Sequence, residues 1–417
     1  MVWLPLDRKS TPIAYHSSMY KTVKTPAAGP VPSIYVEPPQ KVNSEHRRNL
    51  VRRRKEIDAQ IASPDDRVRD KGEATLRNWG KPLDSFAYFT QDSTIDELKQ
   101  ELALDSVEPI KEMQKFLRGE SVSMLKVQKF CAAWANAKNG NTLNENHSWY
   151  RGVDQFVGNL STVAARAEFL YSDCAVSEIR PEFDISKQRG RIVENPASPS
   201  GWGDGGASLA LQSGLGPEFK VAQNTAYAPH ANEVGHVDVA AAIAVHVTDT
   251  MKLKGRRGEN SPAAVISVRG TNRNAWYVLG GKVKLRSLFK GKVASKRQEE
   301  KLRASHQAYF LGAKAYNKAR EEANLQPVYD LSPLPVSAKI FGYPPEAAGK
   351  ILVEEAFRFM ANNPQYNVRF VASGKVDESK PKTRALRDGI CNAAAAFGVN
   401  MRVSKGKDAD ALVAIAN

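Results

Sequence analysis

The chain has 417 residues, of which 42% are hydrophobic and 25% are charged, and this composition is typical of a globular protein and excludes a disordered chain. Its length allows two or three domains, each with its own core. The 60 lysines and arginines outnumber the 45 aspartates and glutamates, so the formal net charge is +15. An excess of this size favours a polyanion or an acidic protein as partner.

Two other classes of protein are excluded by simple counts. No apolar run reaches the roughly 18 residues that a membrane helix needs, because Asp238 and His246 interrupt the best candidate, residues 237–247. We therefore expect no membrane partner. The three cysteines, Cys131, Cys174 and Cys391, are odd in number and widely spaced. This predicts free thiols in a reducing compartment and argues against a zinc module.

The first part of the chain divides into an arm and a helical domain. Residues 1–43 hold seven prolines and little periodicity, which predicts an extended arm that docks on another subunit. Residues 44–174 repeat apolar residues at three- and four-residue steps, which predicts a helical domain. In residues 121–139 these positions are Met124, Val127, Phe130, Cys131 and Trp134, and the same spacing continues from Val153 to Leu170.

Residues 175–293 are predicted to form a β-rich domain. The stretches EFKVAQNT, AAVISVRG and AWYVLGGKVKL are typical of strands, mainly antiparallel and joined by turns. Residues 197–218 form a loop rich in glycine, with glycines at Gly201, Gly203, Gly205 and Gly206. The loop lacks the order of a Walker phosphate-binding loop and joins no clear strand to a helix, so we interpret it as a flexible insertion.

Residues 294–417 read as a long helix followed by an α/β unit. The helix begins at Ser295 and runs to about residue 324, VSAKIF follows as a strand, and residues 346–362 are amphipathic. A β-α-β-β unit completes the chain. The predicted fold class is therefore α+β, with an N-terminal extended arm, a helical region, a central mainly antiparallel β region and a C-terminal α/β unit.

A cluster of polar residues near position 230 could hold a metal or act as an acid or base. His230, Glu233, His236 and Asp238 lie within nine residues, but the two histidines are six apart in a segment that also contains Gly235. A helical metalloprotease site needs them four apart on one helix face. A metal-dependent hydrolase that uses a looser His230/His236 loop stays open as an alternative function. No nucleophile elbow, Walker loop or kinase signature is present. The leading expectation is therefore a protein that is not an enzyme, with no catalytic residues, no metal and no cofactor.

The basic residues are concentrated in one segment. Residues 252–303 carry fifteen lysines and arginines against three glutamates. Lys282, Lys284 and Arg286 alternate along a predicted strand, so they share a face. We expect contacts to nucleic-acid phosphates, without base readout, from Lys252, Lys254, Arg256, Arg257, Lys282, Lys284, Arg286, Lys290, Lys292, Lys296 and Arg297. A solvated face or a contact with acidic neighbouring subunits is an equally supported interpretation.

The stretch NTAYAPHANEVGH resembles a strand-turn of the neck and tail-completion proteins of tailed bacteriophages, Tyr-Ala-Pro-x-x-x-Glu-x-Gly. The matching positions are Tyr227, Ala228, Pro229, Glu233 and Gly235. The resemblance implies a helix-then-sheet protomer that assembles into a ring at the head-tail junction.

Together with the arm, the basic segment and the missing catalytic motifs, this resemblance predicts a structural protein of a viral particle. We expect a capsid-associated or head-tail connector component, located in the virion and assembled in the host cytoplasm. Its partners would be copies of itself and other particle proteins, with residues 1–43 as a docking arm, and DNA or RNA held through phosphate contacts. The first alternative function is a nucleic-acid-binding subunit of a nucleocapsid or ribonucleoprotein, and the metal-dependent hydrolase is the second.

Overall fold

The protein was analysed as a computed structural model that describes residues 22–25, 31–38, 59–60, 62–71, 89, 95–145, 150–172, 184, 187–198, 206–233, 236–248, 251, 261–271, 274–279, 282–287, 294–338, 342–373, 381–404 and 410–414. The chain forms two compact units. One contains residues 1–19 and 39–160, and the other contains residues 20–38 and 161–417.

The first unit is helical in its described residues. Its helices are α4 (Ile95–Glu101), α5 (Glu108–Leu117), α6 (Met124–Asn139) and α7 (Tyr150–Ser161). The periodic side chains of α6 are buried as predicted, and Trp134 donates from Nε1 to the Asp154 carboxylate at 3.0 Å. The helical spacing predicted through Leu170 is wrong, because after the short helix α8 (Val163–Arg166) the chain enters strand β3 (Ala167–Ser172).

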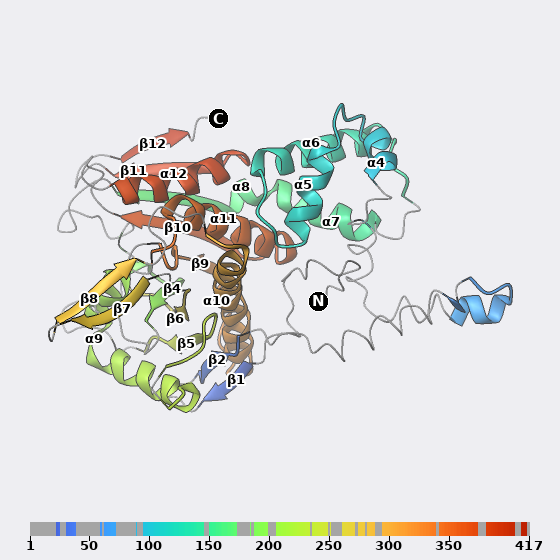
Figure 1. The fold of residues 1–417 in the computed structure, drawn as a ribbon. Helices are drawn as coiled ribbons and strands as arrows, with labels where there is room; N and C mark the ends of the chain where they lie inside the picture. The colour runs from blue at the N-terminus through green and yellow to red at the C-terminus, as the bar shows by residue number, and fades with distance from the viewer. Residues whose placement is uncertain are drawn as a thin grey trace. The chain divides into compact units, whose positions relative to one another are not determined.

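The second unit is built on one mixed sheet (Figure 1). Ten strands of the described residues follow the order β1-β2-β5-β6-β4-β9-β10-β3-β11-β12. With β3, their bounds are β1 (Thr22–Thr25), β2 (Ser33–Val36), β4 (Ile192–Ala197), β5 (Ala242–His246), β6 (Ala264–Arg269), β9 (Asp330–Ser332), β10 (Asn367–Ser373), β11 (Asn400–Ser404) and β12 (Asp410–Ala414). A separate hairpin pairs β7 (Asn274–Leu279) with β8 (Lys282–Ser287).

The middle of the large sheet is parallel. Strands β6, β4, β9, β10, β3 and β11 run in one direction, while β1, β2 and β5 at one side and β12 at the other pair antiparallel. Helices with a mixed sheet confirm the predicted α+β class. The parallel strands β4 and β9 were not predicted, because buried parallel strands are short apolar runs without alternation.

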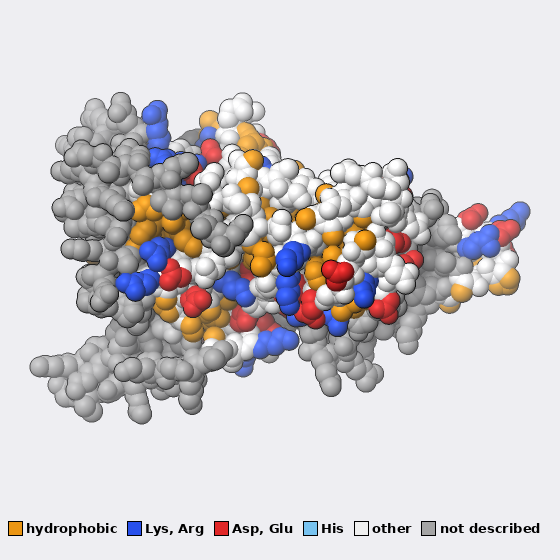
Figure 2. All heavy atoms as spheres, turned by 90° about the horizontal axis from the view of Figure 1, so that it is seen from above, with side chains coloured by type: hydrophobic (Ala, Val, Ile, Leu, Met, Phe, Trp, Pro, Cys, Tyr) orange, Lys and Arg blue, Asp and Glu red, His pale blue; other side chains and the backbone are white. Residues whose placement is uncertain are grey.

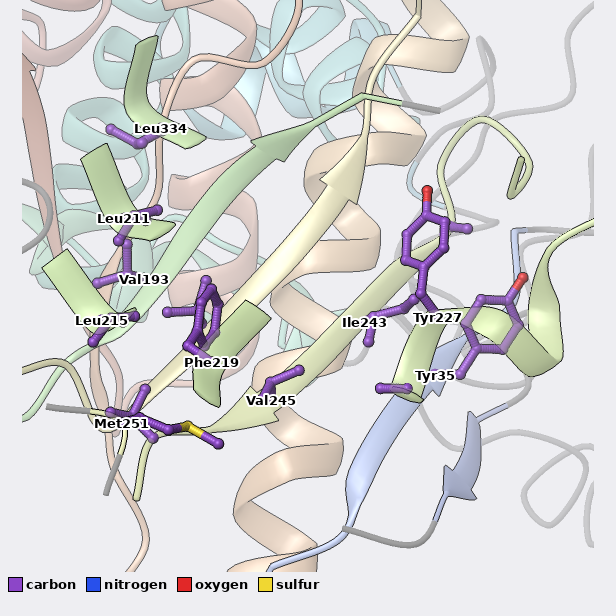
Figure 3. Packing of buried hydrophobic residues seen from close by; sticks show 14 of the residues in the cluster. Tyr35, Val193, Leu211, Leu215, Phe219, Tyr227, Ile243, Val245, Met251 and Leu334 are labelled. Atoms are coloured by element: carbon purple, nitrogen blue, oxygen red, sulfur yellow. The ribbon is translucent and has the colours of Figure 1, made fainter. Parts of the chain in front are cut away.

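Helices cover both faces of this sheet. Helix α9 (Gly206–Tyr227) packs Leu211, Leu215 and Phe219 on Val193 and Val265. On the other face lies α10 (Lys296–Glu322), where Ile266 meets the backbone at Gly312. Neighbouring residues of a strand point to opposite faces, so Val265 and Ile266 place α9 and α10 on opposite sides. Figure 3 shows α9 in front of the strands and α10 behind them.

Helices α11 (Pro345–Asn362) and α12 (Pro381–Ala395) join α10 on its face. Phe310 of α10 stacks on Phe359 of α11 with ring centroids 4.6 Å apart. A capping box at Ser295 and Gln298 begins α10, as the sequence predicts. None of the helices in the described ranges is long and apolar enough to cross a membrane.

Two predicted strands are wrong. EFKVAQNT belongs to α9, since Leu215, Phe219 and Ala226 recur at helical spacing on the buried face, and the helix kinks at Gly216 before Pro217. The strand predicted at VSAKIF lies earlier, at β9, and residues 336–338 form a bend beyond its end. As a result, the segment before α9 follows the end of β4, and residues 333–338 follow the end of β9.

Candidate ligand site at the carboxyl edge of the parallel strands

Strands β4 and β9 are parallel, hydrogen-bonded neighbours, and the chain leaves them toward opposite sides of the sheet. From β4 the chain passes through α9 to β5 and β6 on one side. From β9 it passes through α11 to β10 on the other side. In open parallel sheets such a switch point leaves a crevice outside the carboxyl ends of the two strands, and ligands bind there.

The sequence between β4 and α9 is rich in glycine. Strand β4 ends at Ala197 and α9 begins at Gly206, so the glycine-rich segment joins a strand to the start of a helix. The interpretation of this segment as a flexible insertion rested on the premise that it joins no clear strand to a helix. That premise is wrong. Backbone N–H groups at a helix start have no intrahelical partners and favour an anion.

Two side chains near the start of α9 bury polar atoms that have no hydrogen-bond partner among the residues that the structure describes. Ser208, in the first turn, is 3% exposed, and its Oγ has no partner. The Nε2 atom of Gln212, one turn later, is also buried without a partner. Buried polar groups are normally satisfied, so such atoms are common where a ligand or water completes the site.

The loop after β9 lies at the same edge of the sheet. Ser337 adopts a φ of +67°, its Oγ is buried without a partner, and its carbonyl accepts a hydrogen bond from the N–H of Tyr343 at 3.1 Å. The loop lies against the end of β6, because a Cβ added at Gly270 would come within 2.2 Å of Ser337 Oγ. The ends of β4, β6 and β9 thus meet at one edge.

Beneath this edge a buried hydrogen-bond group ties the strands to α9. Ser267 Oγ of β6 accepts from Asn195 Nδ2 of β4 at 3.0 Å and from Gln223 Nε2 of α9 at 2.8 Å. All three side chains are at most 2% exposed. These two buried hydrogen bonds tie β4, β6 and α9 together.

On the opposite face, Glu194 supports the loop after β9. One carboxylate oxygen accepts from the backbone N–H of Leu334 at 2.9 Å, and the other lies 3.3 Å from Nδ1 of His306 on α10. Both side chains are fully buried. Burial raises the pKa of Glu194, and the neighbouring His306 opposes that rise.

The predicted phosphate-binding residues are only partly described. Lys282, Lys284 and Arg286 lie at alternate positions of β8, and Lys296 and Arg297 are exposed in the first turn of α10. The remaining six fall outside the described residues, namely Lys252, Lys254, Arg256, Arg257, Lys290 and Lys292. Phosphate contacts from this set stay a prediction.

One member of the basic segment is neutralised within the chain. Arg303 is 2% exposed and donates to Glu355 at 2.9 Å and to Glu354 at 2.5 Å, both on α11. On the face in Figure 2, basic and acidic side chains of the described residues are mixed. The net positive charge therefore overstates how much basic surface this face offers.

The histidine loop does not assemble a metal site. In the part of the chain that the structure describes, no three His, Cys, Asp or Glu side chains come close enough to hold a metal ion. His230 instead stacks on Tyr35 of β2, with ring centroids 3.6 Å apart, and Asn232 Oδ1 accepts from the His236 backbone N–H. The metal-dependent hydrolase alternative therefore loses its proposed ligands.

The solved structures that the chain resembles include macrodomains. The Oceanobacillus iheyensis macrodomain with ADP shares 18% identity with a TM-score of 0.32, over 50% of this chain and 86% of that one. The Trypanosoma brucei macrodomain in complex with ADP-ribose shares 12% identity with a TM-score of 0.34, over 54% of this chain and 69% of that one. No protein-family model matches the chain, and the comparison with curated proteins gives no match.

This finding corrects the expectation of a phage neck protein. The chain resembles macrodomains, so the predictions of a virion structural component, of a protein that is not an enzyme, and of particle proteins as partners are wrong. The residues of the motif also fold differently. Tyr227 ends α9 and Ala228–His230 form a 3₁₀ turn, where the resemblance implies a strand before a turn.

Part of the predicted docking arm is a strand of the large sheet. Residues 33–36 form β2 and pair with β5 of the same chain, and Val31, Ile34 and Val36 are buried there. These residues therefore find their hydrogen-bond partners within the chain.

The sequence interpretation missed Glu194, Asn195, Ser208 and Ser337. The available signal was RIV shortly before a glycine-rich stretch, followed by periodic apolar residues. A β-branched pair that leads into glycines and then into a helix pattern is typical of a strand-loop-helix phosphate site.

Proposed function

We propose that the chain binds a nucleotide that carries a diphosphate, such as ADP or ADP-ribose, in the crevice between the ends of β4 and β9. The observation that supports this most is that the chain leaves these neighbouring strands toward opposite sides of the sheet, with β4 leading through a glycine-rich segment into α9. Diphosphates favour such a position, because the helix start supplies both free N–H groups and positive potential.

The buried serine hydroxyls agree with a polar ligand. Ser208 Oγ and Ser337 Oγ are each able to donate one hydrogen bond, and neither does so within the described residues. Ser337 also adopts an unfavourable backbone conformation, which costs roughly 1 kcal/mol or more and is common at ligand-binding loops.

ADP and ADP-ribose are the compounds to test first, because they are named with the macrodomain structures that the chain resembles. The geometry of the strand ends, rather than this likeness, supports a site at this edge.

The test is isothermal titration calorimetry of the full chain with ADP-ribose, ADP and adenosine. We expect ADP-ribose and ADP to bind and adenosine to bind at least about tenfold more weakly, because it lacks the phosphates that the helix start would hold. Ligand recovered after incubation is analysed by mass spectrometry, so that chemical turnover is detected along with binding.

A matched pair of glycine variants locates the site. Gly206→Val places a branched side chain at the first residue of α9, and we expect it to weaken ADP-ribose binding by at least about tenfold, because the backbone could no longer approach a phosphate. Gly158→Val on α7 is the control, since a Cβ there meets nothing within 4 Å. Failure of the unaltered chain to bind either nucleotide, or equal binding by the Gly206 variant, would contradict the proposal.

A further inference from the structure

Arg269 ends strand β6 at the same carboxyl edge, directly opposite Ala197 of β4. Its backbone is held at three points. The N–H donates to Ala241 at 3.1 Å, and the carbonyl accepts from Ala240 N–H at 2.9 Å and from Ser305 Oγ at 3.2 Å. The position of this residue beside the end of β4 is therefore well constrained.

The guanidinium of Arg269 has no partner within the described residues. It is partly buried, and it makes no hydrogen bond or ion pair with another described side chain. Asp238 acts on it electrostatically from beyond ion-pair distance, and burial lowers the pKa of Arg269. Partial burial strengthens charge interactions relative to a fully exposed site, so an anion that reaches this guanidinium would be bound favourably.

The groups around Arg269 extend toward the glycine-rich segment. The Tyr227 hydroxyl donates to the carbonyl of Ser198, the residue that follows β4, at 3.3 Å. His230 stacks on Tyr35, and its Nε2 atom is buried without a partner. Figure 3 shows Tyr227 and Tyr35 at the same end of the hydrophobic cluster. Burial lowers the pKa of Arg269, and its electrostatic neighbours Tyr227 and Asp238 oppose this change.

We propose that Arg269 binds a phosphate group of the nucleotide, with His230 donating a second hydrogen bond from Nε2. This inference rests on the proposed function and extends it, because it places the charge that selects anionic ligands on the β6 side of β4. The guanidinium offers two parallel donors that match two phosphate oxygens, a geometry that lysine does not reproduce.

Calorimetry with ADP-ribose tests the role of Arg269. Charge-assisted hydrogen bonds to a phosphate predict that Arg269→Gln weakens ADP-ribose binding about 10- to 100-fold and leaves adenosine binding unchanged. Arg269→Lys keeps the charge without the two parallel donors, and we expect an intermediate loss. Arg151→Gln, which removes an exposed arginine of α7 and changes the net charge equally, should bind as the unaltered chain does.

For a third variant we expect tighter ADP-ribose binding, a result that misfolding could not produce. Asp238→Asn removes the carboxylate that repels an anion at Arg269, and we expect ADP-ribose binding up to about fivefold tighter. Equal ADP-ribose affinity in the unaltered chain, Arg269→Gln and Arg269→Lys would overturn this inference and leave the proposed function standing. No binding of ADP or ADP-ribose by the unaltered chain would overturn both.

Discussion

Glu194 and His306 place a carboxyl group and an imidazole, both fully buried, directly beneath the candidate site. The carboxylate holds the loop after β9 through the Leu334 N–H. Replacing Glu194 with alanine would leave that donor buried and unsatisfied, which costs about 1–3 kcal/mol in the free energy of unfolding. We expect Glu194→Ala to be destabilised by at least that amount in urea denaturation, and to bind ADP-ribose more weakly because the loop loses its support.

Glu194→Gln separates the charge of this residue from its hydrogen bond. Burial raises the pKa of Glu194, so the folded state holds the proton more tightly than the unfolded state does. The stability that Glu194 contributes is fully present at pH values below its ordinary pKa. It is lost as the pH rises through the pKa of the folded state. The glutamine still accepts from Leu334 N–H and carries no charge. We therefore expect the stability of Glu194→Gln relative to the unaltered chain to increase from pH 4.5 to pH 8, measured as urea midpoints.

The control is Glu218→Gln on the exposed side of α9. Its stability relative to the unaltered chain should not change over the same pH range. If the stability difference between Glu194→Gln and the unaltered chain does not change with pH, the attraction to His306 cancels the cost of burying the Glu194 charge.

Helices α11 and α12 approach so closely that their glycines are required. A Cβ on Gly389 would lie 2.0 Å from the carbonyl oxygen of Glu346, and one on Gly349 would lie 2.6 Å from that of Leu386. Neither contact can be relieved by rotating a side chain, because both obstacles are backbone atoms. The two helices must therefore separate to admit a methyl group.

Gly389→Ala tests this packing. In an open helix this change would stabilise the chain by up to about 1 kcal/mol. Here we expect a loss of roughly 1–3 kcal/mol, because overpacking forces the backbones apart. Gly158→Ala on α7, where a Cβ meets nothing within 4 Å, should give the opposite sign in the same thermal unfolding experiment. A stabilised Gly389→Ala variant would contradict the close approach.

At the scale of the whole molecule, residues 20–38 fold with residues 161–417 although about 120 residues of the first unit intervene. Strand β2 pairs with β5, and Val36 is fully buried beside Gly312 of α10. The hairpin of β1 and β2 thus belongs to the core of the second unit.

Truncating Val36 shows whether this hairpin stabilises the second unit. We expect Val36→Ala to cost about 1–3 kcal/mol, from the lost burial and the cavity that remains. In hydrogen exchange, protection should fall in β5 and stay unchanged in α6 of the other unit. Val23→Ala in β1, at a side chain that is 38% exposed, is the matched control and should change little. Equal protection in β5 for both variants would contradict this account.

Sequence patterns identified most of the helices and the overall class. Helices α6, α10 and α11 follow apolar spacing and capping residues that act within a few turns, so local sequence is sufficient for them. Strand β6 and the β7–β8 hairpin were also predicted, since alternation and a Gly-Gly turn are local signals. The same method misread α9, because β-branched and aromatic residues in EFKVAQNT suit a strand until Leu211 and Leu215 extend the helical period.

The α+β class, the helical periods and the charge balance were determined by the sequence alone, because each depends on residues close together along the chain. The order of the strands, the switch point between β4 and β9, and the place of Arg269 opposite Ala197 were decided only by the tertiary structure. These features depend on contacts between segments tens to hundreds of residues apart, and no local pattern records which strands become neighbours.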